Sequence, residues 1–224
     1  MLRIKASIFF VTRLFLASIL TAQASDFEPL IVTGLLLDDN ANPVEGAQIQ
    51  IWQTDPEGIY DHPLSTLGGA CDLDSNFQYY GTATTASDGN YTFFTARPGR
   101  YAFRPKIHIH FRVWVDDELE HTSQFYFADD GQEDTSGFSS TIVISPESND
   151  VGGQTAIKNI VIDLGGGGTE EITATQPAGP FYPLDDFFDD GNDLILNNGR
   201  RMKSGLRGKR KANDLMQNMI SRWG

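Results

Sequence analysis

Two histidines spaced two residues apart form the pattern in this sequence that could hold a metal ion. His108 and His110 lie in the alternating apolar segment from Ile107 to Val115. In a β-strand such side chains leave the same face with their roots about 6.5–7 Å apart, a gap that two neutral imidazoles can close around one first-row metal ion. Paired core or surface histidines would give the same spacing, so both readings stay open at this point.

Tyrosines are further candidate donors. Tyr60 and Tyr101 each follow a glycine-containing break at which a strand meets a turn. A phenol ordinarily stays protonated up to about pH 10 and fills a core, but a trivalent ion favours the phenolate and lowers its pKa. His62 and His121 also remain as possible ligands. The sequence has one cysteine and no His-Glu-x-x-His motif, which argues against a thiolate zinc site and a zincin site.

The segments that would position these residues have a period of two, which predicts β-strands. Ile107, Ile109 and Phe111 are expected to face a core, which would place the two histidines on the opposite face. Residues 61–79 show little periodicity and are expected to form a loop. Turns rich in Gly, Pro, Asn and Asp bound the expected strands, which cover 31–37, 47–52, 91–94, 101–103, 107–115, 125–127 and 156–164.

This pattern predicts an all-β fold, an antiparallel β-sandwich of the prealbumin-like kind. Little helix is expected outside the first segment and the C-terminal tail. The length of 224 residues fits one domain with appendages, and we expect the sandwich to cover residues 25–164. A formal net charge of -13 argues against nucleic acid as a partner.

The first 24 residues predict a secretory signal peptide. Arg3, Lys5 and Arg13 precede or interrupt an apolar run, and small residues at Ala22 and Ala24 are typical of a cleavage site. The run is too short for a comfortable membrane span. We therefore expect cleavage near Ala24 and a secreted protein whose single cysteine, Cys71, is unpaired.

Two appendages follow the expected sandwich. Residues 165–199 begin with four glycines, a flexible joint, and continue as an acidic, aromatic arm. Residues 200–224 form a tail with eight basic residues against one acid. We expect this tail to be solvated and to fold against residues 25–199, the acidic body of the chain. Association of a C-terminal amphipathic helix with a membrane is the less favoured alternative. The sequence indicates no oligomeric state.

Between residues 30 and 130 the sequence resembles the intradiol ring-cleavage dioxygenases, the catechol and protocatechuate type. The resemblance is specific because two glycine–tyrosine motifs and a His-Ile-His motif occur in the order that this family has. The matching segments are Gly46–Pro63, Asp88–Phe93, Pro98–Tyr101, Arg104–Pro105 followed by His108–Phe111, and Thr122–Phe127.

The resemblance implies a mononuclear non-haem Fe(III) centre. By position in the motifs, Tyr60, Tyr101, His108 and His110 would be the metal ligands. In the family a catechol displaces the second of the two tyrosines, which matches Tyr101, and that tyrosine can take a proton from the substrate. The implied partners are therefore a small aromatic diol and dioxygen, and the implied product is a muconate-type diacid.

Two further residues acquire roles from the resemblance. Arg104 matches the arginine that precedes the family's histidines, where a cation stabilises negative charge that develops on the substrate ring. Gln124 would be a polar contact that lines the pocket. These two, with Tyr101, are the expected catalytic residues.

The sequence departs from the family in two places. One extra residue separates Arg104 from His108, and a β-bulge could absorb it. The segment Thr175–Pro183, with the acidic residues after it, matches an arm that lies before the first strand in the family. Here it would either return to the site through the glycine joint or begin a second, truncated copy.

Two other classes of function compete with the enzyme. Prealbumin-like sandwich modules share the turn motifs and act as binding or structural domains, and fold alone does not separate the classes. A degenerate, metal-free relative of the dioxygenases is the other alternative. Tyr60 together with His108 and His110 favours the enzyme, because a structural module has no reason to carry all three.

Overall fold

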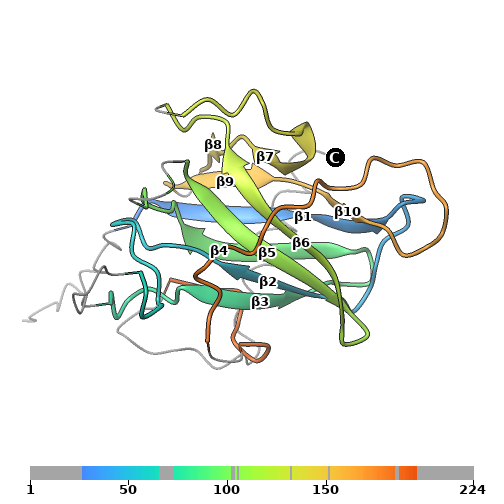
Figure 1. Ribbon diagram of the computed structural model, residues 1–224, viewed down its shortest axis with the longest axis horizontal. Coiled ribbons are helices and arrows are strands. Elements are labelled where there is room, and N and C mark those ends of the chain that lie inside the picture. Colours follow the sequence, from blue (N-terminus) through green and yellow to red (C-terminus); the bar gives the residue numbers. More distant parts are fainter. Residues whose placement is uncertain are drawn as a thin grey trace, which may run out of the picture.

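The computed structural model describes residues 27–65, 73–101, 104, 106–131, 133–150, 152–184 and 187–195. The predicted signal peptide, Cys71 and the basic tail lie outside these residues. The chain forms two five-stranded sheets (Figure 1). The first contains β1 (Pro29–Asp38), β4 (Asn90–Ala96), β8 (Glu147–Ser148), β9 (Gln154–Ile157) and β10 (Ile160–Ile162); the second contains β2 (Gln48–Trp52), β3 (Tyr80–Thr84), β5 (His108–Val115), β6 (Glu118–Phe127) and β7 (Val143–Ile144).

The all-β prediction is confirmed, but both sheets are mixed rather than purely antiparallel. The second sheet has the order β3-β2-β5-β6-β7, and its last pair is parallel. In the first sheet β1 pairs antiparallel with β4 and parallel with both β9 and β10. The two parallel pairs of β1 arise because the long connection after β6 brings the chain back beside β1 in the same direction. One short 3₁₀ helix, η1 (Ser140–Ile142), interrupts this connection.

Several strand predictions differ from the structure: the expected strand 125–127 begins earlier, as β6 from Glu118, and the short strands β7 and β8 were not expected. The predicted strand 156–164 is divided into β9 and β10, because Lys158 and Asn159 leave the ladder and bond the side chain of Tyr91 and the backbone of β1. The segment 61–79 is followed by a strand, β3, that periodicity did not indicate. Tyr101 forms only an isolated bridge with Arg104 instead of starting the expected strand 101–103, whose last two residues are not described.

The inner face of the second sheet is buried, and its outer face is buried around the two histidines and half-buried farther along β5. On the inner face, side chains of β2, β5 and β6 join the apolar core that also contains β1. Members of this face include Ile49, Ile51, Ile109, Phe111, Val113, Phe125 and Phe127. The outer face carries polar and aromatic side chains, among them Gln50, Trp52, His108, His110, Gln124 and Tyr126, all at most 5% exposed. The expected separation of the histidines from the core face is therefore confirmed.

The segment after the glycine joint covers this outer face. We call residues 173–195 the arm. In Figure 1 it runs, orange to red, across β6, β5 and β2. The backbone amide of Gln176 donates to the carbonyl oxygen of Thr122 at 3.1 Å, and Tyr182 packs edge-on against Trp52 at a ring separation of 4.9 Å. The arm then bonds β3 and β4 through the backbone of residues 187–194.

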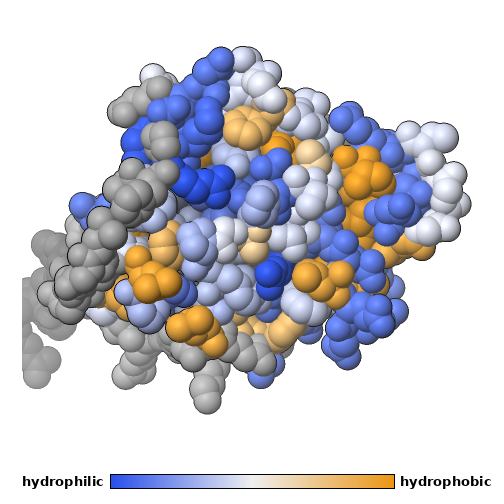
Figure 2. All heavy atoms as spheres, viewed as in Figure 1, coloured by the Kyte–Doolittle hydropathy of each residue, from blue (hydrophilic) through white to orange (hydrophobic). Residues whose placement is uncertain are grey.

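The surface of the described residues offers no continuous apolar face in the view of Figure 2, where apolar side chains lie in separate patches among polar ones. Leu64, Leu119, Ile172 and Leu184 are among the exposed large apolar residues. Within the described ranges, no helix has the length and apolar character needed to cross a membrane.

Candidate metal centre

Three donor atoms converge at the end of β5. Nε2 of His108 lies 3.1 Å from Nε2 of His110, and the phenol oxygen of Tyr60 lies 3.2 Å from the first and 3.1 Å from the second. Histidine ligands bind first-row metals at about 2.0–2.1 Å, so a triangle with sides of this length accommodates one ion in contact with all three atoms. Sequence reasoning selected these three residues, and the structure brings them together.

The protonation states of the histidines suit metal binding. Nδ1 of His108 lies 2.7 Å from the carbonyl oxygen of Lys106, which can only accept, so this nitrogen carries the proton and Nε2 presents a lone pair to the cluster. Burial, which penalises the charged form, lowers the pKa of His108 to about 4 and that of His110 well below its usual value. Both imidazoles are therefore neutral near pH 7.

Burial acts in the opposite direction on the phenol. It raises the pKa of Tyr60 far above 10, and the nearby Arg104 guanidinium only partly offsets the effect. Without a metal ion the hydroxyl of Tyr60 is protonated. A trivalent ion beside the oxygen would supply the positive charge that a buried phenolate needs.

Two loops carry the tyrosines, and we call residues 55–60 and 98–101 the tyrosine loops. The backbones of the two tyrosine loops are in direct contact. A Cβ added at Gly99 would overlap the carbonyl oxygen of Pro56, and Gly58 has a φ of +86°. These two glycines are therefore required by close approach and by backbone conformation, and they set the tyrosine loops side by side.

Hydrogen bonds fix the first tyrosine loop. One carboxylate oxygen of Asp55 accepts from the amides of Glu57 and Ile59, both at 3.0 Å, and the other accepts from the hydroxyl of Tyr79 at 2.9 Å. The amide of Gly99 donates to the carbonyl oxygen of Asp55 at 2.8 Å, which joins the two loops. Asp55 is thus the residue that organises the tyrosines, although neither its type nor its spacing drew attention to it in the sequence.

Tyr101 reaches the cluster by a ring contact. Its ring meets that of Tyr60 edge-on at 5.9 Å, and its side chain is almost fully buried. Burial raises the pKa of its phenol. The structure therefore places the fourth predicted ligand beside the other three, while the three-atom triangle itself involves Tyr60, His108 and His110.

The predicted catalytic residues Arg104 and Gln124 are in contact with each other. Nη2 of Arg104 donates to Oε1 of Gln124 at 2.8 Å and to the hydroxyl of Tyr126 at 2.9 Å. The extra residue before His108 lies in the loop that precedes β5, and the irregularity of the β5–β6 ladder falls far away, between Val113 and Trp114. Arg104 therefore still reaches the residues beside the cluster.

The arm lies directly on the cluster. A Cβ added at Gly179 would lie 3.0 Å from Cε1 of His110, and the φ of Gly179 is +76°. The ring of Phe181 contacts those of Tyr60 at 5.1 Å and Tyr101 at 4.9 Å. Of the two possibilities that the sequence left open, the segment returns to the site.

Two aromatic residues at the site were not indicated by sequence. Trp52 stacks on His110 with ring centroids 4.8 Å apart and planes 5° from parallel. Tyr126 is the register partner of His108 on β6. Pairing of β5 with both neighbouring strands would have located them, because residues opposite the histidines must share their face.

The donor set fits ferric iron better than zinc or a ferrous triad. Within the described residues, no group of three or more His, Cys, Asp or Glu side chains comes together. The cluster is completed by phenol oxygen, a hard donor that suits a trivalent ion, beside two imidazoles. The residues present therefore fit the iron that the family resemblance implies.

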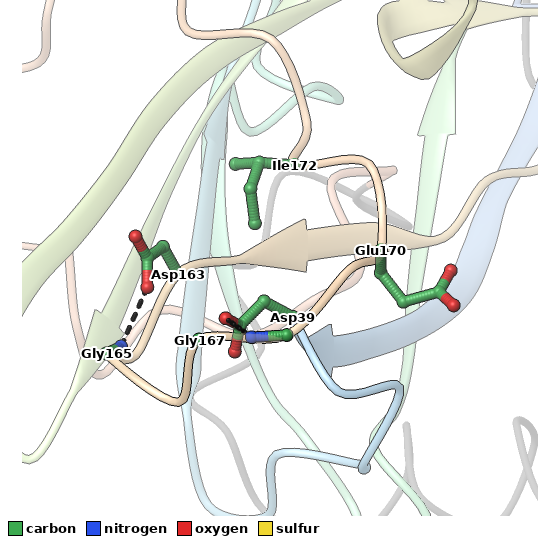
Figure 3. Close-up of a pocket in the computed structure, with 7 residues that line it drawn as sticks. Asp39, Asp163, Gly165, Gly167, Glu170 and Ile172 are labelled. Atoms are coloured by element: carbon green, nitrogen blue, oxygen red, sulfur yellow. Dashed lines mark hydrogen bonds between the residues drawn. The ribbon is translucent and has the colours of Figure 1, made fainter.

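A separate cavity of about 340 Å³ lies at the glycine joint (Figure 3). Asp39, Asp163 and Glu170 line it, and none of the proposed site residues does. Backbone amides already use two of these carboxylates: Gly168 donates to Asp39 at 2.6 Å and Gly165 to Asp163 at 2.7 Å. The carboxylates thus anchor the joint from which the arm departs.

The fold and the cluster define the class: an all-β sandwich protein with a buried histidine–tyrosine centre on the outer face of one sheet. The family model described as Dioxygenase matches residues 18–145, more than half of the chain. The chain therefore belongs to the intradiol ring-cleavage dioxygenase family.

Similar proteins agree with this family. The chain is 35% identical over 96 residues to the protocatechuate 3,4-dioxygenase beta chain of Burkholderia cepacia, which covers 40% of each chain. It is 33% identical over 104 residues to a hydroxyquinol 1,2-dioxygenase of Rhizobium sp. (strain MTP-10005), covering 38% of this chain and 33% of the relative. The chain thus spans well under half the length of these curated relatives.

One solved structure is similar over most of its length. It is the dioxygenase domain of a dioxygenase carbohydrate-binding protein fusion from Streptomyces sp. SirexAA-E, with a TM-score of 0.51 and 25% identity. The match covers 63% of this chain and 84% of that domain.

Proposed function

We propose that this protein cleaves a catechol-type ring between its two hydroxyl-bearing carbons, with dioxygen as co-substrate, at one non-haem Fe(III). The observation that carries the proposal is the convergence of Tyr60 Oη with Nε2 of His108 and of His110 at 3.1–3.2 Å. Both oxygen atoms enter the product, so a diol and one dioxygen balance as a muconate-type diacid.

The chain's own residues would hold the ion through two imidazoles and a phenolate, with Tyr101 as the fourth ligand. When bound, ferric iron supplies electron withdrawal from a diol, which makes ring carbon reactive toward dioxygen. Tyr60 is enclosed by the tyrosine loops and Phe181, so its oxygen is kept from water. Because burial disfavours a free phenolate, proton transfer to Tyr101 Oη from a substrate hydroxyl is favoured.

Arg104 is suited to stabilise negative charge on the substrate ring. Its hydrogen-bond partners among the described residues are the neutral side chains of Gln124 and Tyr126 and the backbone of Tyr101. No described carboxylate forms an ion pair with it. The charge of this guanidinium is therefore not neutralised by an acid. Because the group is already fixed beside the cluster, it can stabilise charge on the substrate ring without moving during the reaction.

An uncharged catechol or hydroxyquinol suits the site better than a carboxylated ring. The other basic residues between 97 and 106 are paired with acids: Arg97 with Asp129, Arg100 with Asp130, and Lys106 with Glu133. Arg112 packs on the ring of Tyr182 at 3.9 Å. Arg104 and Arg112 both lie close enough to His110 to lower its pKa, but the ring of Tyr182 covers Arg112. Arg104 would then be the cation that serves the reacting ring, with no further free cation among the described residues to bind a ring carboxylate.

The colour of the protein tests the proposal. Phenolate-to-Fe(III) charge transfer gives a red-brown visible band, which an added catechol should shift. Oxygen uptake against catechol, hydroxyquinol and protocatechuate would then identify the ring. A colourless protein that holds no iron after reconstitution would refute the assignment and support a non-catalytic sandwich module or a metal-free relative.

The cellular location belongs to the same proposal. The basic, apolar and small-residue pattern of residues 1–24 supports export with cleavage near Ala24. Mass spectrometry of the N-terminus of secreted protein tests it: a mature chain that begins at Ser25 supports export, and an uncleaved Met1 would contradict it.

A further inference from the structure

Three polar side chains beside the cluster form a closed ring of hydrogen bonds. Arg104 Nη2 donates to Oε1 of Gln124 at 2.8 Å and to the hydroxyl oxygen of Tyr126 at 2.9 Å. The hydroxyl of Tyr126 in turn donates to the same Oε1 at 2.8 Å. Oε1 thus accepts twice, and the hydroxyl accepts once and donates once, so each group uses its ordinary hydrogen-bonding capacity.

This ring determines which way the amide of Gln124 points. Oε1 faces two donors, so the Nε2 end must face the other way, where it donates to the carbonyl oxygen of Pro177. In the reversed orientation the NH₂ group would meet the guanidinium, and the carbonyl oxygen of Pro177 would lose its donor. The hydroxyl of Tyr126 therefore contributes to the orientation that reaches the arm.

The bond to Pro177 holds the part of the arm that lies on the cluster. Gly179, two residues later, is the residue that lies against His110, and Phe181 covers Tyr60. Before Pro177 the arm is held by the Gln176 amide on Thr122, by the Ala174 amide on Thr141 and by the Ser123 hydroxyl on the carbonyl oxygen of Ala174. From Pro177 to Phe181 the Gln124 contact is the one hydrogen bond to the arm among the described residues, so it accounts for much of the attachment of this part.

The position of the Tyr126 hydroxyl is itself fixed. Tyr126 is 1% exposed, and its ring stacks on Phe138 with centroids 4.2 Å apart and planes 11° from parallel. Tyr126 also lies opposite His108 in the β5–β6 register. A rigid ring in a central strand is a suitable support for a network that must keep one geometry.

We propose that Tyr126 is a positioning residue, whose hydroxyl orients Arg104 and Gln124 and, through Gln124, holds the arm on the tyrosine–histidine cluster. The effect on turnover rests on the proposed function. The effect on the arm does not, because it concerns hydrogen bonds within the protein.

Hydrogen exchange of the Gln176 amide in the full-length protein tests the proposal. Tyr126→Phe keeps the ring and its stacking and removes one donor and one acceptor. We expect exchange at Gln176 to become about five- to tenfold faster, the effect of one lost hydrogen bond. The matched control is Tyr91→Phe, which removes a buried hydroxyl bonded to Lys158 on the other sheet and should leave Gln176 unchanged. Unaltered exchange in Tyr126→Phe would overturn the proposal.

A second variant tests whether Tyr126 acts on the arm through Gln124. Gln124→Glu keeps an acceptor for Arg104 and Tyr126 but has no N–H for Pro177, so the arm should already exchange faster. Adding Tyr126→Phe should then change the exchange rate little, because both act through the same bond. An equal further acceleration would show that the Tyr126 hydroxyl acts on the arm by a route other than the Gln124–Pro177 bond, and would also overturn the proposal.

Turnover provides the separate readout for the reaction. If iron-loaded Tyr126→Phe cleaves catechol, kcat/KM should fall about tenfold with iron content unchanged. If the wild-type protein turns over no catechol at all, the proposed function fails, while the exchange results still decide the role of Tyr126 in holding the arm.

Discussion

The two faces of the second sheet are both buried around His108 and His110 but differ in chemistry. The inner face presents Ile51, Ile109 and Phe111 to the sandwich core, as in any packed sheet. The outer face presents His108 and His110 beside other polar and aromatic side chains. In a sandwich with one core the outer face would be solvated. Here the tyrosine loops and the arm cover it.

The difference shows how a common fold acquires a reactive site. The inner face stabilises the sheet by burying apolar surface, and substitutions there act through packing. The outer face buries groups that need partners, and it depends on segments distant in sequence to provide them. Substitutions in the segments that cover the outer face should therefore impair the site even where the protein still folds.

The test with the largest expected effect replaces one histidine on each face, in separate variants, by alanine. His110→Ala removes a ligand of the proposed centre, and we expect loss of the visible band and a fall in iron affinity of more than about a hundredfold. His121 lies on the inner face, where its ring stacks on Phe111. His121→Ala should retain iron after reconstitution. Iron content and absorption measure both variants, and an iron-replete His110→Ala would remove the basis of the comparison.

A second test concerns the tyrosine loops. Gly99→Ala would place a methyl group against the backbone of Pro56, so the loops must separate and the free energy of unfolding should fall by about 3 kcal/mol. Gly137→Ala is the matched control, because nothing lies within 4 Å of its added Cβ. Chemical denaturation measures both. Equal stability of the two variants would mean that the loops are not set by this contact.

The sheet and the site differ in how far the sequence predicts them. The alternation of residues 107–115 predicted both the strand and the separation of the histidines from the core, because side-chain direction in a strand is a local property. Their positions beside glycine-containing turns made Tyr60 and Tyr101 candidate donors, and the family resemblance gave them the role of ligands. Local pattern did not show that Asp55 organises their loop, since that role depends on backbone amides that only the folded turn brings together.

Two other features lay beyond the sequence for similar physical reasons. β3 is short and follows a long irregular segment, and its pairing with β2 is a long-range contact that periodicity does not show. The return of the arm was left undecided because a glycine joint sets no direction for the chain after it. Contacts of Gly179 and Phe181 with the cluster decide the matter.

A third test removes the cover from the outer face without touching a proposed ligand. Phe181→Ala deletes the ring that packs on Tyr60 and Tyr101, so we expect retained iron with kcat/KM for catechol lowered about tenfold. Gly179→Ala should act in the same direction, because its methyl group would crowd His110. Leu184→Ala, which alters a 74% exposed side chain of the same arm, is the control. Wild-type turnover in both site variants would exclude a role for the arm.

The smallest expected effect separates the faces by pH. Burial lowers the pKa of His121, and its Nε2 has no hydrogen-bond partner among the described residues. The unfolded chain takes up this proton near pH 6.5 while the folded chain resists it. Stability is therefore complete above that pH and falls as the pH drops below it, by at most about 1.4 kcal/mol per pH unit.

Comparison with His121→Gln in iron-free protein isolates this contribution. Both proteins keep His108 and His110, so their shared titration cancels, and the wild type should lose stability more steeply between pH 7 and pH 5. Denaturation curves at each pH measure the difference. If the two profiles run parallel, the inner-face imidazole titrates as it does in the unfolded chain, and burial would then not be what keeps this histidine neutral.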